Sequence, residues 1–261
     1  VSKMENNKIQ LYNMDYLEFM KTLEDNSIDL ILTDPPYGTT ACKWDSIIPL
    51  DSMWEQLKRI IKPNGAIVMT ASQPFTTILI ASNMKMFKYC WVWNKSRVTG
   101  FANAKKQPLR CIEDIVVFYR NPPTYNPQGL IRINKKVKNG RSVGGNTLRA
   151  DINESANKGS LRTAGSEYIQ EFTGYPKQIL QISSEGKTVH PTQKPVTLME
   201  YLIKTYTNEG ETVLDFTMGS GSTGIACLNT NRSFIGCELD ENYFKIAKDR
   251  IENHKLKNNN K

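Results

Sequence analysis

Residues 212–224 are Thr-Val-Leu-Asp-Phe-Thr-Met-Gly-Ser-Gly-Ser-Thr-Gly. The apolar start of this stretch predicts a short buried strand that ends at Asp215, and the glycines Gly219 and Gly221 predict a turn into a helix. Glycine tolerates positive φ and lets a ligand approach the backbone closely. A strand, a Gly-rich turn and a helix in this order are typical of α/β folds that bind ligands at the carboxyl ends of strands.

A second strand is expected over residues 233–237, and it ends at Glu238. An acidic residue about 20 positions beyond a Gly-rich turn suits the hydroxyl pair of a ribose. Asp240 competes for this role, but it precedes a helical pattern over residues 241–247 and suits the N-cap of that helix. We therefore assign Glu238 to the ribose of an adenosine-containing ligand.

The sequence Thr33-Asp34-Pro35-Pro36-Tyr37 follows the apolar run 28–32. The carboxylate of Asp34 and the carbonyl of Pro35 can accept hydrogen bonds from a planar amine and localise its nitrogen lone pair. Prolines fix φ and bring no competing N–H donor, and Tyr37 offers a ring on which a flipped base could stack. The same residues also suit a rigid turn with Asp34 as a local cap. The Gly-rich turn after Asp215 favours the catalytic interpretation of this motif.

Together with His190-Pro191-Thr192-Gln193-Lys194-Pro195, these motifs resemble the amino-group DNA methyltransferases that use S-adenosylmethionine. The catalytic loop precedes the cofactor turn, which resembles the β class of that family. The resemblance extends from about Ile9 to about Ile251. It implies a base-flipping enzyme that methylates the N6 amine of adenine, because Asp rather than Ser opens the loop. In the same way it implies these catalytic residues: Asp34, Pro35, Pro36 and Tyr37.

The expected cofactor-binding residues are Asp15, Thr192, Lys194, Asp215, Phe216, Gly219, Gly221 and Glu238. Lys194 is expected to meet the methionine carboxylate, whereas Asp15 suits either the adenine end or the N-cap of a helix. The turn departs from the family pattern, because Phe216 stands where Pro is usual and Thr217 where Phe is usual. N4-cytosine methylation, methylation of RNA or a protein glutamine, and a weakly active DNA-binding subunit stay open as alternatives.

Lysine and arginine total 34 against 26 aspartates and glutamates, which gives a net charge of +8 and favours a polyanionic partner. Residues 94–111 contain five basic residues and no acid, and residues 121–188 contain ten basic and five acidic residues. We expect contacts with the phosphates of double-stranded DNA, although such runs also suit a solvated surface. The candidates are Lys95, Arg97, Lys105, Lys106, Arg110, Lys135, Lys136 and Arg141.

The five cysteines form no C-x-x-C pair and there are only two histidines, so we expect reduced thiols and no metal site. No apolar run has the roughly 20 residues of a membrane span, and no signal peptide is recognisable. We therefore expect a cytoplasmic protein. The sequence leaves open the oligomeric state, a homodimer included, as well as the target sequence and any partner endonuclease.

Strand and helix patterns alternate along most of the chain, which predicts a doubly wound, mostly parallel α/β sheet of the S-adenosylmethionine-dependent methyltransferase type. Residues 121–188 interrupt the alternation, since they are rich in Asn, Gly, Ser and Lys. We expect a catalytic half over 1–120, an inserted target-recognition region over 121–188 and a cofactor-binding half over 189–261.

Overall fold

The computed structural model describes residues 8–38, 48–138, 167–186, 189 and 193–259. The chain forms two compact units, one of residues 1–126 with 177–261 and one of residues 127–176. The second unit is shorter than the predicted insertion, because residues 121–126 and 177–188 belong to the first unit.

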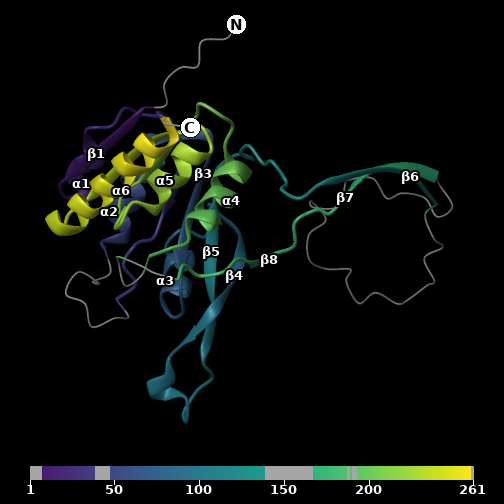
Figure 1. Cartoon of the computed structure of the whole chain (residues 1–261), viewed down its shortest axis with the longest axis horizontal. Coiled ribbons are helices and arrows are strands. Elements are labelled where there is room, and N and C mark those ends of the chain that lie inside the picture. The colour runs from purple at the N-terminus through teal and green to yellow at the C-terminus, as the bar shows by residue number, and fades with distance from the viewer. Residues whose placement is uncertain (1–7, 39–47, 139–166, 187–188, 190–192, 260–261) are drawn as a thin grey trace, which may run out of the picture. The chain divides into compact units, whose positions relative to one another are not determined.

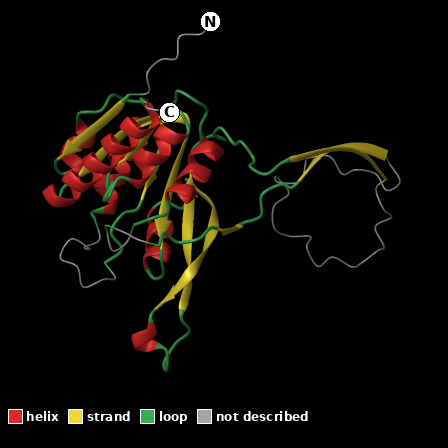
Figure 2. Ribbon diagram, in the orientation of Figure 1, coloured by secondary structure: helices red, strands yellow, loops and turns green. Residues whose placement is uncertain are grey.

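The larger unit contains an eight-stranded sheet in the order β1-β10-β9-β2-β3-β5-β4-β8 (Figures 1 and 2). Its strands are β1 Ile9–Asn13, β2 Ile28–Thr33, β3 Ile61–Ala71, β4 Phe87–Thr99, β5 Arg110–Phe118, β8 Ile179–Gln181, β9 Thr212–Asp215 and β10 Ser233–Glu238. The pairings from β1 to β3 are parallel, whereas β5 pairs antiparallel with both β3 and β4. The predicted mostly parallel α/β fold is confirmed.

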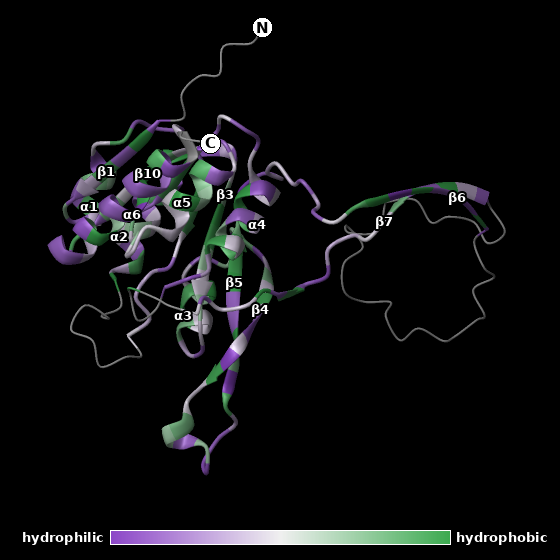
Figure 3. Cartoon of the chain, viewed as in Figure 1, coloured by the Kyte–Doolittle hydropathy of each residue, from purple (hydrophilic) through white to green (hydrophobic). Residues whose placement is uncertain are grey.

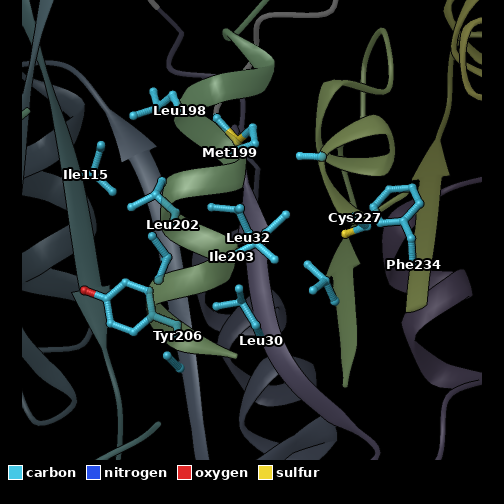
Figure 4. Close-up of a cluster of buried hydrophobic side chains, with 14 of the residues drawn as sticks. Leu30, Leu32, Ile115, Leu198, Met199, Leu202, Ile203, Tyr206, Cys227 and Phe234 are labelled. Carbon is cyan, nitrogen blue, oxygen red and sulfur yellow. The ribbon is translucent and has the colours of Figure 1, made fainter. Parts of the chain in front are cut away.

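Among the described residues, six α-helices cover the two faces of this sheet (Figure 2). They are α1 Tyr16–Lys21, α2 Leu50–Ile60, α3 Phe75–Ser82, α4 Val196–Tyr206, α5 Ser222–Asn229 and α6 Glu241–Asn259. Side chains alternate across strands, so Leu30 and Leu32 pack with α4, α5 and α6, whereas Ile31 packs with α1, α2 and α3. Figure 4 shows the first of these clusters, where Leu202 and Tyr206 of α4 lie over the strands.

Pro63, Asn64 and Gly65, residue types that are common in turns, lie inside β3, where the sheet is irregular. Ile28 pairs with Ile61, but Leu30 already pairs with Ala66, so the strand bulges between these two points. Extra residues on one strand of a pair are accommodated by a local bend. These residues therefore bend the beginning of β3, and they do not form a separate turn between α2 and β3.

Strands β4 and β5 continue beyond the sheet as a two-stranded hairpin (Figure 1). Its turn contains the short 3-10 helix Phe101–Asn103, preceded by Gly100 at φ 94°. Almost every residue from 96 to 112 is exposed, and we call this segment the arm. Hydropathy colouring shows mixed polar and apolar residues along it (Figure 3).

The smaller unit contains a two-stranded antiparallel ribbon of β6 Ile131–Lys138 and β7 Glu167–Thr173. The side chains of β6 are exposed apart from Val137. Lys136 pairs with Glu167 at 2.6 Å across the ribbon, and both side chains are well exposed. The sequence showed no strand pattern here, because an exposed ribbon without a buried face lacks the alternation that marks a strand.

No helix among the described residues is both long enough and apolar enough to span a bilayer.

Candidate active site

A cavity of about 520 Å³ opens at the carboxyl ends of the central parallel strands. Strands β2 and β9 are neighbours and parallel, so the residues that follow them, from Asp34 and from Asp215, meet at one edge of the sheet. The residues predicted from sequence that line the cavity are Asp15, Asp34, Pro36, Lys194, Asp215, Phe216, Gly219 and Glu238. The two motifs therefore form a single site.

Asp215 lies beneath the Gly-rich turn with only 3% of its surface exposed. Its carboxylate accepts hydrogen bonds from the hydroxyls of Thr33 at 2.8 Å and Thr223 at 2.7 Å, and from the backbone N–H of Thr217 at 3.2 Å. Burial raises the pKa of Asp215 to about 7, although these hydrogen bonds act in the opposite direction. Asp215 thus ties the end of β2 to the beginning of α5.

Glu238 is the last residue of β10 and lies next to the Gly-rich turn. Its carboxylate accepts hydrogen bonds from the backbone N–H groups of Gly219 at 2.9 Å and Asp240 at 3.0 Å. Burial raises the pKa of Glu238, and these backbone donors oppose the rise. Asp240 accepts from the N–H groups of Asn242 and Tyr243 at the start of α6, as predicted for an N-cap. Glu238 therefore remains our candidate for the ribose.

Asp15 is the N-cap of α1, which is one of the two roles that the sequence suggested for it. Its carboxylate accepts hydrogen bonds from the N–H groups of Leu17 and Glu18 and caps α1. It also lines the cavity, so capping does not remove it from the site. Phe216, beside the turn, is 1% exposed and its ring lies 5.7 Å from that of Tyr16.

Asp34 is surrounded by donors from three parts of the chain. One carboxylate oxygen accepts hydrogen bonds from the hydroxyls of Tyr37, at 2.5 Å, and Thr70. The other oxygen accepts from the ammonium of Lys194 at 2.6 Å. The Asp34 side chain is 23% exposed, so the carboxylate is fixed in position while part of it still faces the cavity.

Lys194, which also lines the cavity, lies between two carboxylates of the protein. Its Nζ is 2.6 Å from Asp34 and 3.4 Å from Glu113, and its side chain is 8% exposed. Burial alone would lower the pKa of Lys194, but the two carboxylates outweigh it and the net pKa is raised. The ammonium thus holds the loop that carries Asp34, and its predicted contact with the methionine carboxylate stays a prediction. We call Asp34, Tyr37, Thr70, Glu113 and Lys194 the catalytic cluster.

The ring of Tyr37 packs against Phe75, with the centroids 5.4 Å apart and the planes 22° from parallel. The ammonium of Lys194 lies 5.6 Å from the Tyr37 centroid. Burial and then Asp34 raise the pKa of the Tyr37 hydroxyl well above its usual range. Tyr37 therefore stays neutral and serves Asp34 as a donor, and its predicted stacking on a base stays a prediction.

Gly221 packs against α6 and is not among the residues that line the cavity, so its predicted contact with the cofactor stays a prediction. Its φ is 79°, and a Cβ built there would lie 3.0 Å from Ile251 and 3.1 Å from Ala247 of α6. The glycine is required because the turn passes close to a helix in a left-handed conformation. Only Gly219 of the two assigned glycines faces the cavity.

The predicted DNA-contacting residues fall into different environments. Lys95 is 12% exposed and pairs with Glu113 at 3.1 Å, so it belongs beside the catalytic cluster and is not free for phosphates. Arg97, Lys105, Lys106 and Arg110 are exposed on the arm, and Lys135 and Lys136 are exposed on the ribbon. Arg141 and Thr192 lie outside the described residues.

A family model described as DNA methylase, for N6 and N4 methyltransferases, matches residues 28–249. The chain belongs to this DNA methylase family. The methylase is 30% identical over 251 residues to the Type II methyltransferase M.HpaI of Haemophilus parainfluenzae. This alignment covers 90% of this chain and 72% of M.HpaI. It is 26% identical to M1.MboII of Moraxella bovis, with 94% and 96% covered. The amino-group methyltransferase resemblance predicted from the motifs is confirmed.

Solved structures place the methylase in the same fold. The complex of M1.HpyAVI with S-adenosylmethionine matches with a TM-score of 0.61 and 26% identity, covering 93% of this chain and 99% of that chain. The cytosine-N4-specific PvuII DNA methyltransferase matches with a TM-score of 0.66 and 15% identity, covering 95% and 91%. At 15% identity the second match concerns the fold alone.

Thr217 has no role that could be predicted from its sequence pattern, but the structure gives it one. Its hydroxyl lies 2.6 Å from that of Thr33 and donates a hydrogen bond to the backbone carbonyl of Asp34 at 3.2 Å. Thr217 therefore links the cofactor turn of this methylase directly to its catalytic loop. The only available signal was the departure from the usual Phe at this position. Thr70 and Glu113, the other members of the catalytic cluster not assigned from sequence, come from β3 and β5.

Proposed function

We propose that this methylase transfers a methyl group from S-adenosylmethionine to the N6 amine of adenine in double-stranded DNA. The observation that carries the proposal is the position of Asp34. Its carboxylate lies at the carboxyl end of β2, faces the same cavity as the Gly-rich turn, and is held by three donors. A fixed acceptor beside a cofactor cavity is what an amine methyltransferase needs.

The cavity suits an adenosine-containing sulfonium. Glu238 presents a carboxylate oriented by two backbone N–H groups, and Asp15 and Phe216 line the same volume. Asp215, Gly219 and Glu238 are the residues that would hold the cofactor. Once bound, the sulfonium supplies an electrophilic methyl group and a neutral leaving group. No group of three or more His, Cys, Asp or Glu among the described residues forms a metal cluster.

Asp34 retains the capacity to bind the substrate amine. An ionised carboxylate offers about four acceptor positions, and Tyr37, Thr70 and Lys194 occupy three of them. The remaining position can accept an N–H of the amine, and the Pro35 carbonyl can accept the other. Two such hydrogen bonds favour a pyramidal nitrogen with its lone pair directed at the methyl group.

Lys194 supports this geometry as a positioning residue. Its ammonium lies 2.6 Å from the Asp34 carboxylate, and its contact with Glu113 fixes the ammonium from the other side. The arrangement needs no general base before attack, because the amine nitrogen loses its proton after the methyl group has been transferred. The chain therefore contributes orientation and electrostatics to the reaction.

Adenine is favoured over cytosine because Asp occupies the first position of the loop. The physics of localising a lone pair is the same for both amines, so the product must be measured. DNA from bacteria without adenine methylation, expressing this chain, should contain N6-methyladenine, and the Asp34→Ala strain should not. N4-methylcytosine as the sole modified base would overturn the adenine assignment while leaving the site intact. Absence of both bases would overturn the proposed function.

A further inference from the structure

The arm, residues 96–112, has few contacts with the rest of the described chain. Beyond the strand pairing at its base, between Asn94 and Ile112, its side chains form two hydrogen bonds to other described residues. The N–H of Ser184 donates to Ser96, and Arg97 donates to the carbonyl of Gly186. A two-stranded hairpin without a packed face is marginally stable in water. A segment of this kind, extended beyond its sheet, suggests a partner outside the chain.

The base of the arm is joined to the catalytic cluster. Glu113 lies 3.4 Å from Lys194, which in turn contacts Asp34, and Trp93 pairs with Glu113 across the hairpin. From that pair the strand runs six residues to Thr99, which at 3.3 Å per residue is about 20 Å. This reach is more than twice the depth of a DNA groove, about 8 Å.

The charge of the arm fits a polyanion. Arg97, Lys105, Lys106 and Arg110 are exposed along it, and no acidic residue occurs between Asn94 and Cys111. Within the described part of the chain, none of these four side chains forms an ion pair with a carboxylate, whereas Lys95 at the base is paired with Glu113. Exposed cations without a carboxylate partner on a projecting hairpin are available for phosphates.

Phe101 lies in the turn at the end of the arm and is 67% exposed. It is the only phenylalanine among the described residues with an exposed side chain. Gly100, directly before it, has open space around its Cα, since nothing lies within 4 Å of a Cβ built there. An aromatic ring presented between cations can enter a base stack, because apolar wedges unstack bases in DNA complexes.

We propose that the arm grips the duplex beside the target base and that Phe101 occupies or props open the base stack from which the target leaves. This inference rests on the proposed function. It assigns the arm to duplex distortion and leaves methyl transfer to the catalytic cluster. A second copy of the chain is the rival partner, but two arms of the same positive charge would repel each other.

The charge component is tested with a fluorescein-labelled duplex and salt titration. Replacing Arg97, Lys105 and Lys106 together by Gln should weaken binding and reduce the slope of log K against log salt by up to about 0.9 for each lost phosphate contact. The matched control replaces three exposed lysines of α6, Lys248, Lys255 and Lys257, by Gln, which changes the net charge equally. Equal slopes in the two triple variants would overturn the proposal.

The wedge is tested on a duplex containing a sequence that the wild-type chain methylates in cells. Phe101→Ala should lower kcat/KM on the paired duplex about tenfold, within the range expected for loss of one stacking contact. On the same duplex with an abasic site opposite the target base, the variant should approach wild type, because that base is already unpaired. Phe101→Trp should retain activity on both. Equal losses on both duplexes would overturn the wedge.

Two further outcomes separate this inference from the proposed function. If DNA from cells that express the wild-type chain contains no methylated base, the proposed function fails, and the salt titration still tests whether the arm binds the duplex. If Phe101→Ala changes the sedimentation mass of the protein and not the ratio of activities on the two duplexes, the tip of the arm is a contact between subunits and the proposal is overturned.

Discussion

The region of the catalytic cluster and the arm both contain lysines, but the environments of these lysines differ. Lys194 in the cluster is buried, Lys95 beside the cluster is 12% exposed, and each pairs with a carboxylate. In the arm, Lys105 and Lys106 are exposed and form no ion pair with any described residue. Buried charges need partners because desolvation is costly, whereas exposed charges are solvated until a ligand displaces water and ions. The cluster is therefore organised in advance, and the arm acquires its contacts from DNA.

The comparison predicts that loss of Asp34 affects chemistry and not DNA binding. Asp34→Ala should lower kcat about a hundredfold or more, the usual cost of one preorganised hydrogen bond in a transition state. Affinity for the duplex and its salt dependence should stay near wild type, because those depend on exposed cations such as those of the arm. Single-turnover kinetics and salt titration measure the two quantities. Tyr37→Phe is the control, and it should keep much of the activity because the ring and Asp34 remain. Near wild-type kcat in Asp34→Ala would sink the mechanism.

Valine substitutions at two glycines with positive φ distinguish the cost of backbone strain from the cost of a steric clash. Gly221→Val should lower the free energy of unfolding by about 2–4 kcal/mol, because a left-handed β-branched residue would also press on Ile251 and Ala247. Gly100, in the arm, has φ 94°, and no atom lies within 4 Å of a Cβ built there. Gly100→Val should therefore lower the free energy of unfolding by the backbone strain alone, about 1–2 kcal/mol. Urea denaturation measures both. Equal losses would mean that the contact of Gly221 with α6 has no energetic weight.

The buried carboxyl of Asp215 should make stability depend on pH. Burial raises its folded pKa to about 7, from 3.8 when unfolded. The folded state then holds the proton more tightly, so this group lowers the free energy of unfolding as pH rises from about 4 to about 7. Asp215→Asn removes the titration while keeping a hydrogen-bond acceptor. Urea denaturation across this pH range measures the free energy of unfolding of both proteins. The value for wild type minus the value for Asp215→Asn should fall as the pH rises. A constant difference would contradict the raised pKa.

The smallest expected effect concerns Thr217, which joins the cofactor turn to Asp34. Thr217→Val keeps the shape but removes the hydroxyl, and loss of a typical hydrogen bond of about 1 kcal/mol should lower kcat roughly fivefold. KM for DNA should change little, since the arm is untouched. Thr217→Ser restores the hydroxyl and should recover kcat. A Ser variant as slow as the Val variant would show that packing of the methyl group matters and the hydrogen bond does not.

The sequence determined the fold class and the location of the site. Apolar runs that end at Asp34, Asp215 and Glu238 predicted three strand ends, and parallel neighbouring strands place such ends at one edge. Local turn chemistry also predicted Asp240 as the N-cap of α6. These features could be predicted because they depend on residues within a few positions of each other.

Only the tertiary structure decided which side chains meet. Lys194 and Asp34 are 160 residues apart, and their contact depends on the order and register of strands, which no local pattern contains. The same register turns Lys95 toward Glu113 while Arg97, two residues further, is exposed. Gly221 faces α6 because the path of that helix fixes its neighbours. Local periodicity and turn residues thus set the elements, whereas burial of charge and close packing between distant elements set the roles of individual residues.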